Sequence, residues 1–217
     1  MPMRDVDRNP KAVWDAMQKG NRRFIEDAQQ RPNQDQSRRS QLREGQNPRA
    51  VVLACSDSRV PVEIVFDVGL GDLFVIRTAG EIIDLSVLAS LEYAVESLGV
   101  ELVVVMGHES CGAVKATADA LDGGTIPDGF QRVLIEKVSP SILVSKAENR
   151  NTVSDFERQH IIETVGQVIS RSPELKAHLD NGTVGVVGLR YRLSDGLAEP
   201  VCTFGVSDED TNGVGTS

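Results

Sequence analysis

The chain has 217 residues, of which 40% are hydrophobic and 25% are charged, so it can bury one sizeable core. Its formal net charge of -9 excludes nonspecific binding to nucleic acid, which needs clustered Lys and Arg, so partners are expected among small molecules and other copies of the chain. No apolar run approaches the roughly 20 residues that span a bilayer, and three cysteines, an odd number, argue against a disulfide framework. We therefore expect one cytoplasmic domain that binds no membrane.

The first 50 residues are polar and are predicted to form a helical arm. Apolar residues recur in this segment at roughly helical spacing, at Val13, Trp14, Met17, Phe24 and Ile25. A stripe of this kind needs a surface to pack on. We expect the arm, residues 1–50, to pack on a partner subunit.

From residue 51 the sequence predicts strands that alternate with helices. Four short, continuous, Val-rich runs suit strands that are buried on both faces of a parallel sheet, at 50–54, 73–76, 100–106 and 183–189. Between the second and third runs, leucines and Val95 recur every three or four residues from a possible Asp84 cap to Gly99, which predicts an amphipathic helix. Residues 124–129 are predicted to be a loop between helices.

The fold class that follows is α/β. Residues 51–206 are predicted to form the catalytic domain, with a central, mostly parallel β-sheet flanked by helices and preceded by the N-terminal helical arm. Residues 207–217 contain few apolar groups and are predicted to be a disordered tail.

Two predicted strand ends carry the residues that could bind a metal ion. Ligands of an open parallel sheet bind beyond the carboxyl ends of its strands. Cys55 follows the first run, and His108 and Cys111 follow the run at 100–106. If these strands are near neighbours, two thiolates and one imidazole converge, which is a typical zinc set that leaves a fourth position open for water. We therefore predict a catalytic zinc site at these three residues.

The other cysteine and histidines are given structural roles. Cys202 is interpreted as a core residue, and His160 and His178 as residues on helix surfaces. Glu109 neighbours His108 in a tight turn, where adjacent side chains point apart, so it is expected to be solvated or in outer contact with the site.

Asp57 and Arg59 lie two and four residues after Cys55. Because Asp57 and Arg59 are two residues apart, their side chains can lie on the same side of an extended loop. An ordinary ion pair that stabilises the loop would explain them, but the nearby metal ligand favours a second role. The guanidinium can keep Asp57 ionised and aim it at the open position of the metal.

The pair of motifs, Cys-x-Asp-x-Arg at 55–59 and His-x-x-Cys-Gly at 108–112, resembles that of the β-class carbonic anhydrases, in order and spacing, over roughly residues 10–205. The resemblance implies a lyase with one Zn2+ per chain, in which zinc-bound hydroxide hydrates carbon dioxide reversibly to bicarbonate. It also implies a catalytic dyad of Asp57 and Arg59, and a homodimer or homotetramer.

The resemblance further implies a substrate pocket lined partly by aromatic residues at a dimer interface. The corresponding positions here are Gln46, Phe74, Ala79, Tyr93 and Gly112. Ala79 stands where a Val is common in the family, which changes the shape of the pocket rather than its chemistry. Ala113 stands where a second Gly is frequent, and no functional loss is expected from it.

Some members of the family close their site at low pH, with bicarbonate held by a Trp and an Arg. Val52 occupies the position of the Trp, and Arg77 that of the Arg. Without the indole, an Arg is a poor cradle for bicarbonate, and Arg77 could instead form an ion pair in the core or an interface. We therefore predict that bicarbonate does not shut this enzyme down cooperatively.

The same residues argue against several other functions. A zinc dehydrogenase would need a dinucleotide-binding glycine fingerprint, but Phe74 stands where its third Gly belongs. A thiol phosphatase would need an Arg six residues after its Cys, whereas Arg59 is four residues after Cys55. A non-enzymatic zinc protein would more naturally supply a fourth ligand. Hydrolysis of carbon disulfide or carbonyl sulfide at the same zinc remains open.

Overall fold

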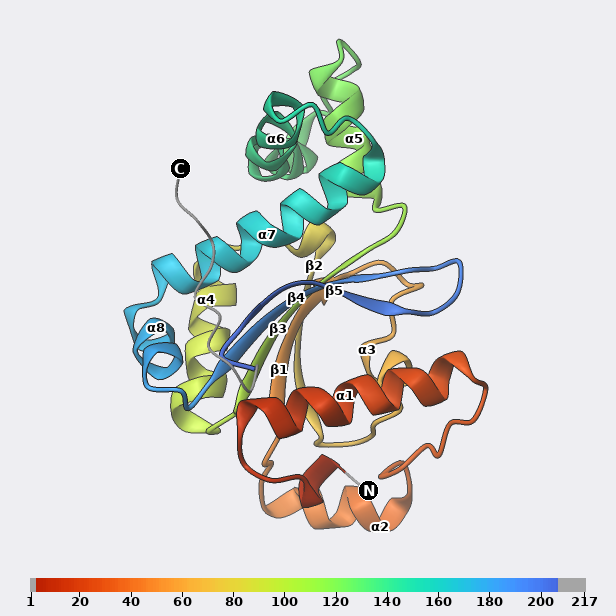
Figure 1. Cartoon of the computed structure of the whole chain (residues 1–217), viewed down its shortest axis with the longest axis vertical. Coiled ribbons are helices and arrows are strands. Elements are labelled where there is room, and N and C mark those ends of the chain that lie inside the picture. The colour runs from red at the N-terminus through yellow and green to blue at the C-terminus, as the bar shows by residue number, and fades with distance from the viewer. Residues whose placement is uncertain (1–2, 207–217) are drawn as a thin grey trace.

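The computed structural model describes residues 3–206, which form a five-stranded sheet in the order β2-β1-β3-β4-β5 (Figure 1). The strands are β1 (Ala50–Cys55), β2 (Leu73–Thr78), β3 (Leu102–His108), β4 (Gly185–Tyr191) and β5 (Ala198–Phe204). The first four run parallel, which confirms the predicted mostly parallel sheet. The predicted disordered tail, residues 207–217, lies outside the described residues.

Strand β5 was not predicted. It pairs antiparallel with β4 at the edge of the sheet, and the register shifts between Gly188 and Leu189. Pro200 interrupts its hydrophobic pattern, and an edge strand tolerates a proline because one side of the strand needs no hydrogen-bond donors. Cys202 on this strand is half-buried and packs against the core, in agreement with its interpretation.

Eight α-helices surround the sheet within the described residues. They are α1 (Pro10–Ile25), α2 (Gln36–Gln41), α3 (Val62–Val65), α4 (Leu85–Glu92), α5 (Gly112–Leu121), α6 (Arg132–Ala147), α7 (Val153–Arg171) and α8 (Pro173–Asp180). The predicted start of α4 is confirmed, because the Asp84 carboxylate caps the helix by accepting from the Val87 amide at 2.9 Å. Over residues 3–206, no helix combines the length and hydrophobicity needed to cross a bilayer.

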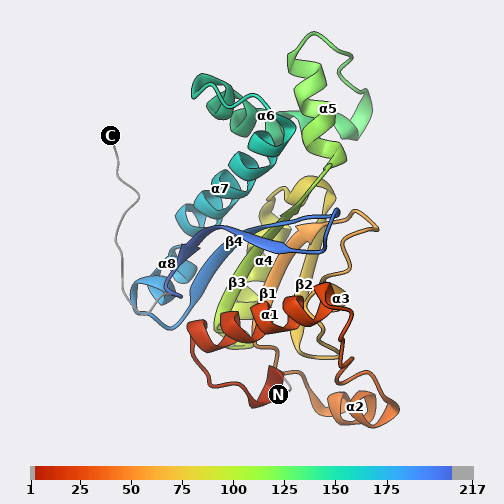
Figure 2. The same cartoon turned by 45° about the vertical axis from the view of Figure 1, so that its right-hand side comes forward.

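The sheet separates two hydrophobic clusters because successive strand residues point to opposite faces. Val52 and Ala54 of β1 pack in the cluster that contains α1, whereas Val51 and Leu53 pack in the cluster that contains α4, α7 and α8. Figures 1 and 2 show α1 on one face of the sheet and α4, α7 and α8 on the other, with α5 and α6 beyond one end. Helices α5 and α6 therefore stand over the strand ends where the metal site is predicted.

The apolar stripe of the N-terminal arm packs on its own subunit. Val13, Trp14 and Met17 of α1 are buried against the sheet, with exposed fractions of 0–5%. The stripe is therefore covered by the sheet face opposite α7 within the same chain. A contact of other arm residues with a partner subunit stays a prediction.

Candidate metal centre

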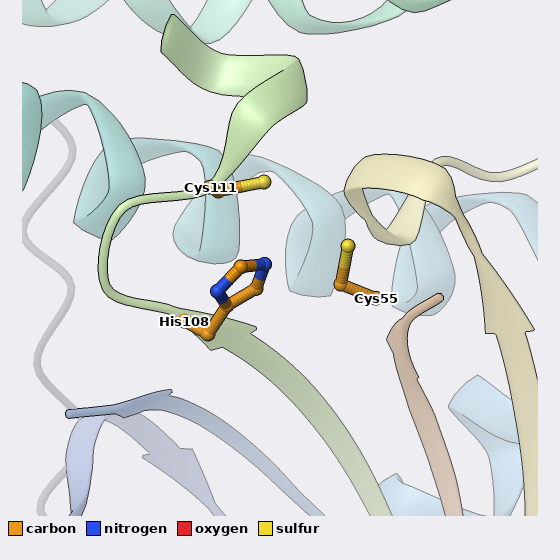
Figure 3. A group of neighbouring side chains, drawn as sticks. All are labelled: Cys55, His108 and Cys111. Carbon is orange, nitrogen blue, oxygen red and sulfur yellow. The ribbon is translucent and has the colours of Figure 1, made fainter. Parts of the chain in front are cut away.

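Cys55, His108 and Cys111 converge at one end of the sheet, as predicted. Strands β1 and β3 are adjacent and parallel, so their last residues, Cys55 and His108, emerge at the same edge. Cys111 occupies the N-cap position of α5, shortly beyond β3, and its side chain makes no capping hydrogen bond. The two sulfurs and the imidazole nitrogen lie within 4.8 Å of one another and point toward a common space (Figure 3). All three residues are buried.

The imidazole of His108 is oriented with a free lone pair toward the two sulfurs. Its Nδ1 donates to the carbonyl oxygen of Glu109 at 2.9 Å, which leaves Nε2 unprotonated in the neutral ring. Nε2 is buried and has no hydrogen-bond partner among the described residues. A buried nitrogen without a partner is costly, and a metal ion would satisfy it. The residues present therefore fit a zinc ion.

The two thiols differ in acidity because their sulfurs lie close together. The Cys111 thiol and the Gly80 amide lower the pKa of Cys55 to about 4, although burial opposes this shift. The pKa of Cys111 is raised by its hydrogen bond to Cys55 and by burial. A divalent cation bound between the two sulfurs would stabilise both thiolates, and its binding would release their protons.

Asp57 and Arg59 form the predicted ion pair at the edge of this cluster. Nε and Nη2 of Arg59 donate to the two carboxylate oxygens of Asp57 at 2.9 and 2.7 Å, and the Arg59 amide donates at 2.9 Å. This bidentate contact holds the pKa of the Asp57 carboxyl well below its usual range. Oδ2 of Asp57 lies 3.9 Å from Nε2 of His108, so the carboxylate borders the space between the ligands.

Two of the predicted pocket residues lie beside the metal cluster. Ala79 follows β2 directly and precedes Gly80, whose amide donates to the Cys55 sulfur at 3.3 Å. Gly112 follows Cys111 and opens α5, and a side chain at this position would meet no atom within 4 Å. These two residues are placed where they can border a small substrate.

The other three predicted pocket residues lie away from the cluster within the subunit. Phe74 pairs with Val51 near the start of β1, and its ring lies 6.1 Å from that of Tyr93. Gln46 precedes β1 and is exposed. Because β1 rises about 3.3 Å per residue, its first and last residues are roughly 16 Å apart. The single subunit therefore does not bring Gln46, Phe74 and Tyr93 to its own metal site.

Helix α7 supplies a buried ion pair behind Cys111 that the sequence analysis missed. Oε1 of Glu157 accepts from the Cys111 amide at 3.3 Å, and its Oε2 accepts from Arg190 Nε of β4 at 2.8 Å. Both charged side chains are less than 10% exposed. Glu157 follows the buried Phe156, and an acidic residue inside an apolar stripe is the signal that could have identified it.

The interpretation of His160 as a surface residue was wrong. It is 3% exposed, its Nε2 donates to the Gly80 carbonyl at 2.8 Å, and its Nδ1 lies 3.0 Å from the Ser141 hydroxyl. Ile161 and Val165 extend the buried face of α7 next to it, so helical spacing could have placed His160 inside. It supports the turn that contains Glu81, a buried residue with φ of 40° whose pKa is raised by burial.

His178 and Glu109 lie outside the cluster, as predicted. His178 is half-buried on α8 and lies 3.0 Å from a Glu96 carboxylate oxygen. The Glu109 carboxylate accepts from the Ser194 amide at 2.9 Å. Neither side chain belongs to the group that could hold a metal ion.

Known proteins are similar to this chain in both fold and sequence. A profile of the carbonic anhydrase family matches residues 50–198. A carbonic anhydrase of Mycolicibacterium smegmatis is 51% identical over 88% of this chain and 93% of its own length. Carbonic anhydrase 2 of Mycobacterium tuberculosis is 46% identical over 88% of this chain and 92% of its own.

Solved structures agree with these sequence matches. The Coccomyxa β-carbonic anhydrase in complex with acetazolamide has a TM-score of 0.64 and 26% identity over 74% of this chain and 75% of its own. A tetrameric β-carbonic anhydrase of Sordaria macrospora has a TM-score of 0.68 over 76% of this chain and 86% of its own, and at 24% identity it shows the fold alone.

The fold and the Cys-His-Cys cluster define the chain as an α/β zinc enzyme of the lyase class. It belongs to the carbonic anhydrase family, in its β class. The resemblance predicted from residues 55–59 and 108–112 is thereby confirmed, and so is the activity that it implied.

Proposed function

We propose that the chain hydrates carbon dioxide reversibly to bicarbonate and a proton at one zinc ion held by Cys55, His108 and Cys111. The observation that carries this proposal is the buried Nε2 of His108, which has no hydrogen-bond partner among the described residues and points toward two cysteine sulfurs. Zinc in such a site supplies a Lewis acid that lowers the pKa of water toward neutrality. Three protein ligands leave a position for the reacting water.

The proposed dyad acts on that water. Asp57 accepts a hydrogen bond from it and so orients a lone pair toward the substrate. Arg59 keeps the carboxylate ionised and fixed in place through its bidentate contact. Ala79 and Gly112 border the space for carbon dioxide, and the space beside Gly112 is open, with no atom within 4 Å of the position of a Cβ there.

A homodimer, or a tetramer built from two homodimers, is proposed to complete the pocket. Gln46, Phe74 and Tyr93 would then serve the metal site of the partner, because Gln46 precedes β1 and Phe74, which contacts Tyr93, pairs with Val51, roughly 13 Å of strand from Cys55. Tyr93 is 49% exposed, in agreement with a role at an interface. The Sordaria relative is tetrameric. The proposed cytoplasmic location is supported by three unpaired cysteines, which suit a reducing compartment.

Stopped-flow assays with three substrates test the function directly. We expect rapid hydration of carbon dioxide by the zinc-loaded enzyme, and little hydrolysis of carbon disulfide or carbonyl sulfide under the same conditions. If a preparation with one zinc per chain turns over only carbon disulfide or carbonyl sulfide, that compound replaces carbon dioxide as the proposed substrate. A zinc-loaded preparation that turns over none of the three would contradict the enzymatic function.

Metal analysis of ligand variants tests the zinc site. Cys55→Ser, His108→Ala and Cys111→Ser should each bind much less than one zinc per chain, because two remaining ligands hold the ion weakly. Cys202→Ser is the matched control, since Cys202 lies on β5 outside the cluster, and it should retain its zinc. Full zinc occupancy in any of the three ligand variants would contradict the assignment of that ligand.

A further inference from the structure

Arg77 lies near the carboxyl end of β2 and reaches across to the loop that follows β1. Its Nε and Nη2 donate to the carbonyl oxygen of Cys55 at 3.0 and 2.8 Å, and Nη2 also donates to the carbonyl oxygen of Asp57 at 2.6 Å. Within residues 3–206, Arg77 forms no ion pair with an acidic side chain. The guanidinium therefore binds the main chain of the loop rather than a charge partner.

The two carbonyl groups that Arg77 holds belong to a metal ligand and to the catalytic aspartate. They are two residues apart, so in an extended segment they can face the same guanidinium. Arg59 holds the Asp57 side chain, whereas the Asp57 carbonyl oxygen accepts both from Arg77 and from the Val60 amide, the latter at 3.0 Å. Arg77 thus joins the carbonyl groups of Cys55 and Asp57, and Arg59 holds the Asp57 carboxylate.

Other contacts between β2 and the loop each act on a single residue. The Ser56 amide donates to the Thr78 carbonyl at 3.0 Å, and the Gly80 amide donates to the Cys55 sulfur at 3.3 Å. Main-chain groups make both contacts, so they would survive a change of side chain at position 77. A change of side chain at position 77 would, however, remove the bridge that Arg77 makes between the carbonyl groups of Cys55 and Asp57.

We propose that Arg77 is a positioning residue for the hydration reaction, which sets the placement of the Asp57 carboxylate relative to the metal-binding sulfur of Cys55. The inference rests on the proposed function. Lysine could not replace it, because an ammonium group is a point charge on a flexible stem, whereas the planar guanidinium offers donors in a fixed fork. A small displacement of Asp57 would weaken its contact with the reacting water without removing the zinc ligands.

Arg77→Lys and Arg77→Met test the inference, with Arg38→Met as the matched control. Arg38 Nε also donates to a carbonyl oxygen, that of Leu70 at 3.0 Å, but from α2 at the opposite end of the sheet from α5 (Figure 1). We expect both Arg77 variants to keep one zinc per chain and to lose roughly tenfold to a hundredfold in kcat, with KM changed less than about threefold. Amide hydrogen exchange of residues 54–60 should accelerate in the zinc-loaded variants.

The control should match the wild-type protein in kcat, zinc content and hydrogen exchange. Wild-type kcat in both Arg77 variants would overturn the inference, and so would a fall in kcat that only matches a loss of zinc. Arg77→Lys keeps the charge and most of the stem, so it remains informative if Arg77→Met fails to fold. An inactive wild-type enzyme would instead contradict the proposed function, which keeps the two failures distinguishable.

Discussion

At the scale of single residues, Asp57 stays ionised and so does not set the pH response of the site. The Arg59 guanidinium holds the pKa of the Asp57 carboxyl below its usual range. An ordinary Asp carboxyl has a pKa of about 3.9. Because the pKa of Asp57 is lower, its carboxylate stays ionised even at that pH and is protonated only in stronger acid. Protonation of Asp57 therefore cannot account for a loss of activity between pH 6 and 8.

We accordingly expect kcat/KM to rise with pH through a single ionisation at the metal centre, by about tenfold per pH unit on the acid limb. Bicarbonate should inhibit without cooperativity, since Val52 is fully buried in the core and the Arg77 guanidinium binds loop carbonyls. Stopped-flow rates from pH 6 to 9, with and without bicarbonate, measure the pH dependence of kcat/KM and the inhibition by bicarbonate. A profile that needs two coupled protons, or steep cooperative inhibition, would show that the site switches.

The zinc cluster was predictable from the sequence because Cys55 and His108 follow apolar runs and the ends of adjacent parallel strands must meet. The contacts behind it were not predictable in the same way. His160 binds the Gly80 carbonyl, and Glu157 binds the Cys111 amide. Almost every residue has these main-chain groups, so the type of residue does not indicate such contacts. The role of Arg77 was missed for the same reason, because it binds carbonyl oxygens rather than an acidic side chain.

At the scale of elements, Asp67 fastens the N-terminal arm to the sheet domain. Its carboxylate, 1% exposed, accepts from Arg23 Nε near the end of α1 and from the amides of Gln30 and Arg31 in the segment that follows. Burial alone would raise the pKa of Asp67, but these donors outweigh it and hold the pKa below its usual value. The ionised carboxylate is therefore the form that the fold stabilises.

Asp67→Asn should lower the free energy of unfolding by roughly 1–3 kcal/mol at pH 7. The side chain of Asn carries an NH2 group in place of one carboxylate oxygen, and this group cannot accept the hydrogen bonds that the carboxylate oxygen now accepts. Since the pKa is lower in the folded state, the stabilisation exists above the unfolded-state value of about 3.9 and disappears as the pH falls below it. The difference between wild-type and variant should shrink accordingly in acid.

Urea denaturation at several pH values measures this difference, with Asp180→Asn as the control. Asp180 pairs with Lys176 on the surface of α8, where an exposed ion pair contributes under about 0.5 kcal/mol. Equal losses in the two variants at pH 7 would contradict the anchoring role of Asp67.

At the scale of the whole molecule, the subunit separates the two groups of residues assigned to one pocket. The metal cluster lies at the carboxyl ends of the strands, whereas Gln46 and the ring pair of Phe74 and Tyr93 lie toward the amino ends of β1 and β2. The strand ends predicted the metal group, whereas the second group was predicted only by a resemblance that implies a pocket at a dimer interface. Strand β2 is an edge strand with half-buried apolar residues, so a second copy has a surface to contact there.

Two co-expressed mixtures distinguish a pocket shared between subunits from one made within a subunit. In the first, Gln46→Ala is combined with Cys55→Ser, two variants that should each be nearly inactive as homodimers. If Gln46 serves the partner's site, half of the dimers are mixed and each has one intact site, so activity should recover to about one quarter of wild type. If Gln46 serves its own site, no activity should appear.

The second mixture combines wild-type chains with the double variant Gln46→Ala/Cys55→Ser. A shared pocket leaves only the wild-type homodimers active, about one quarter of the total activity, whereas a pocket within one subunit leaves about one half. Equal recovery in the two mixtures is therefore the result expected here, since every complete site needs zinc ligands from one chain and Gln46 from the other. Sedimentation must show dimers or tetramers in both samples, and an active monomer would contradict the shared pocket outright.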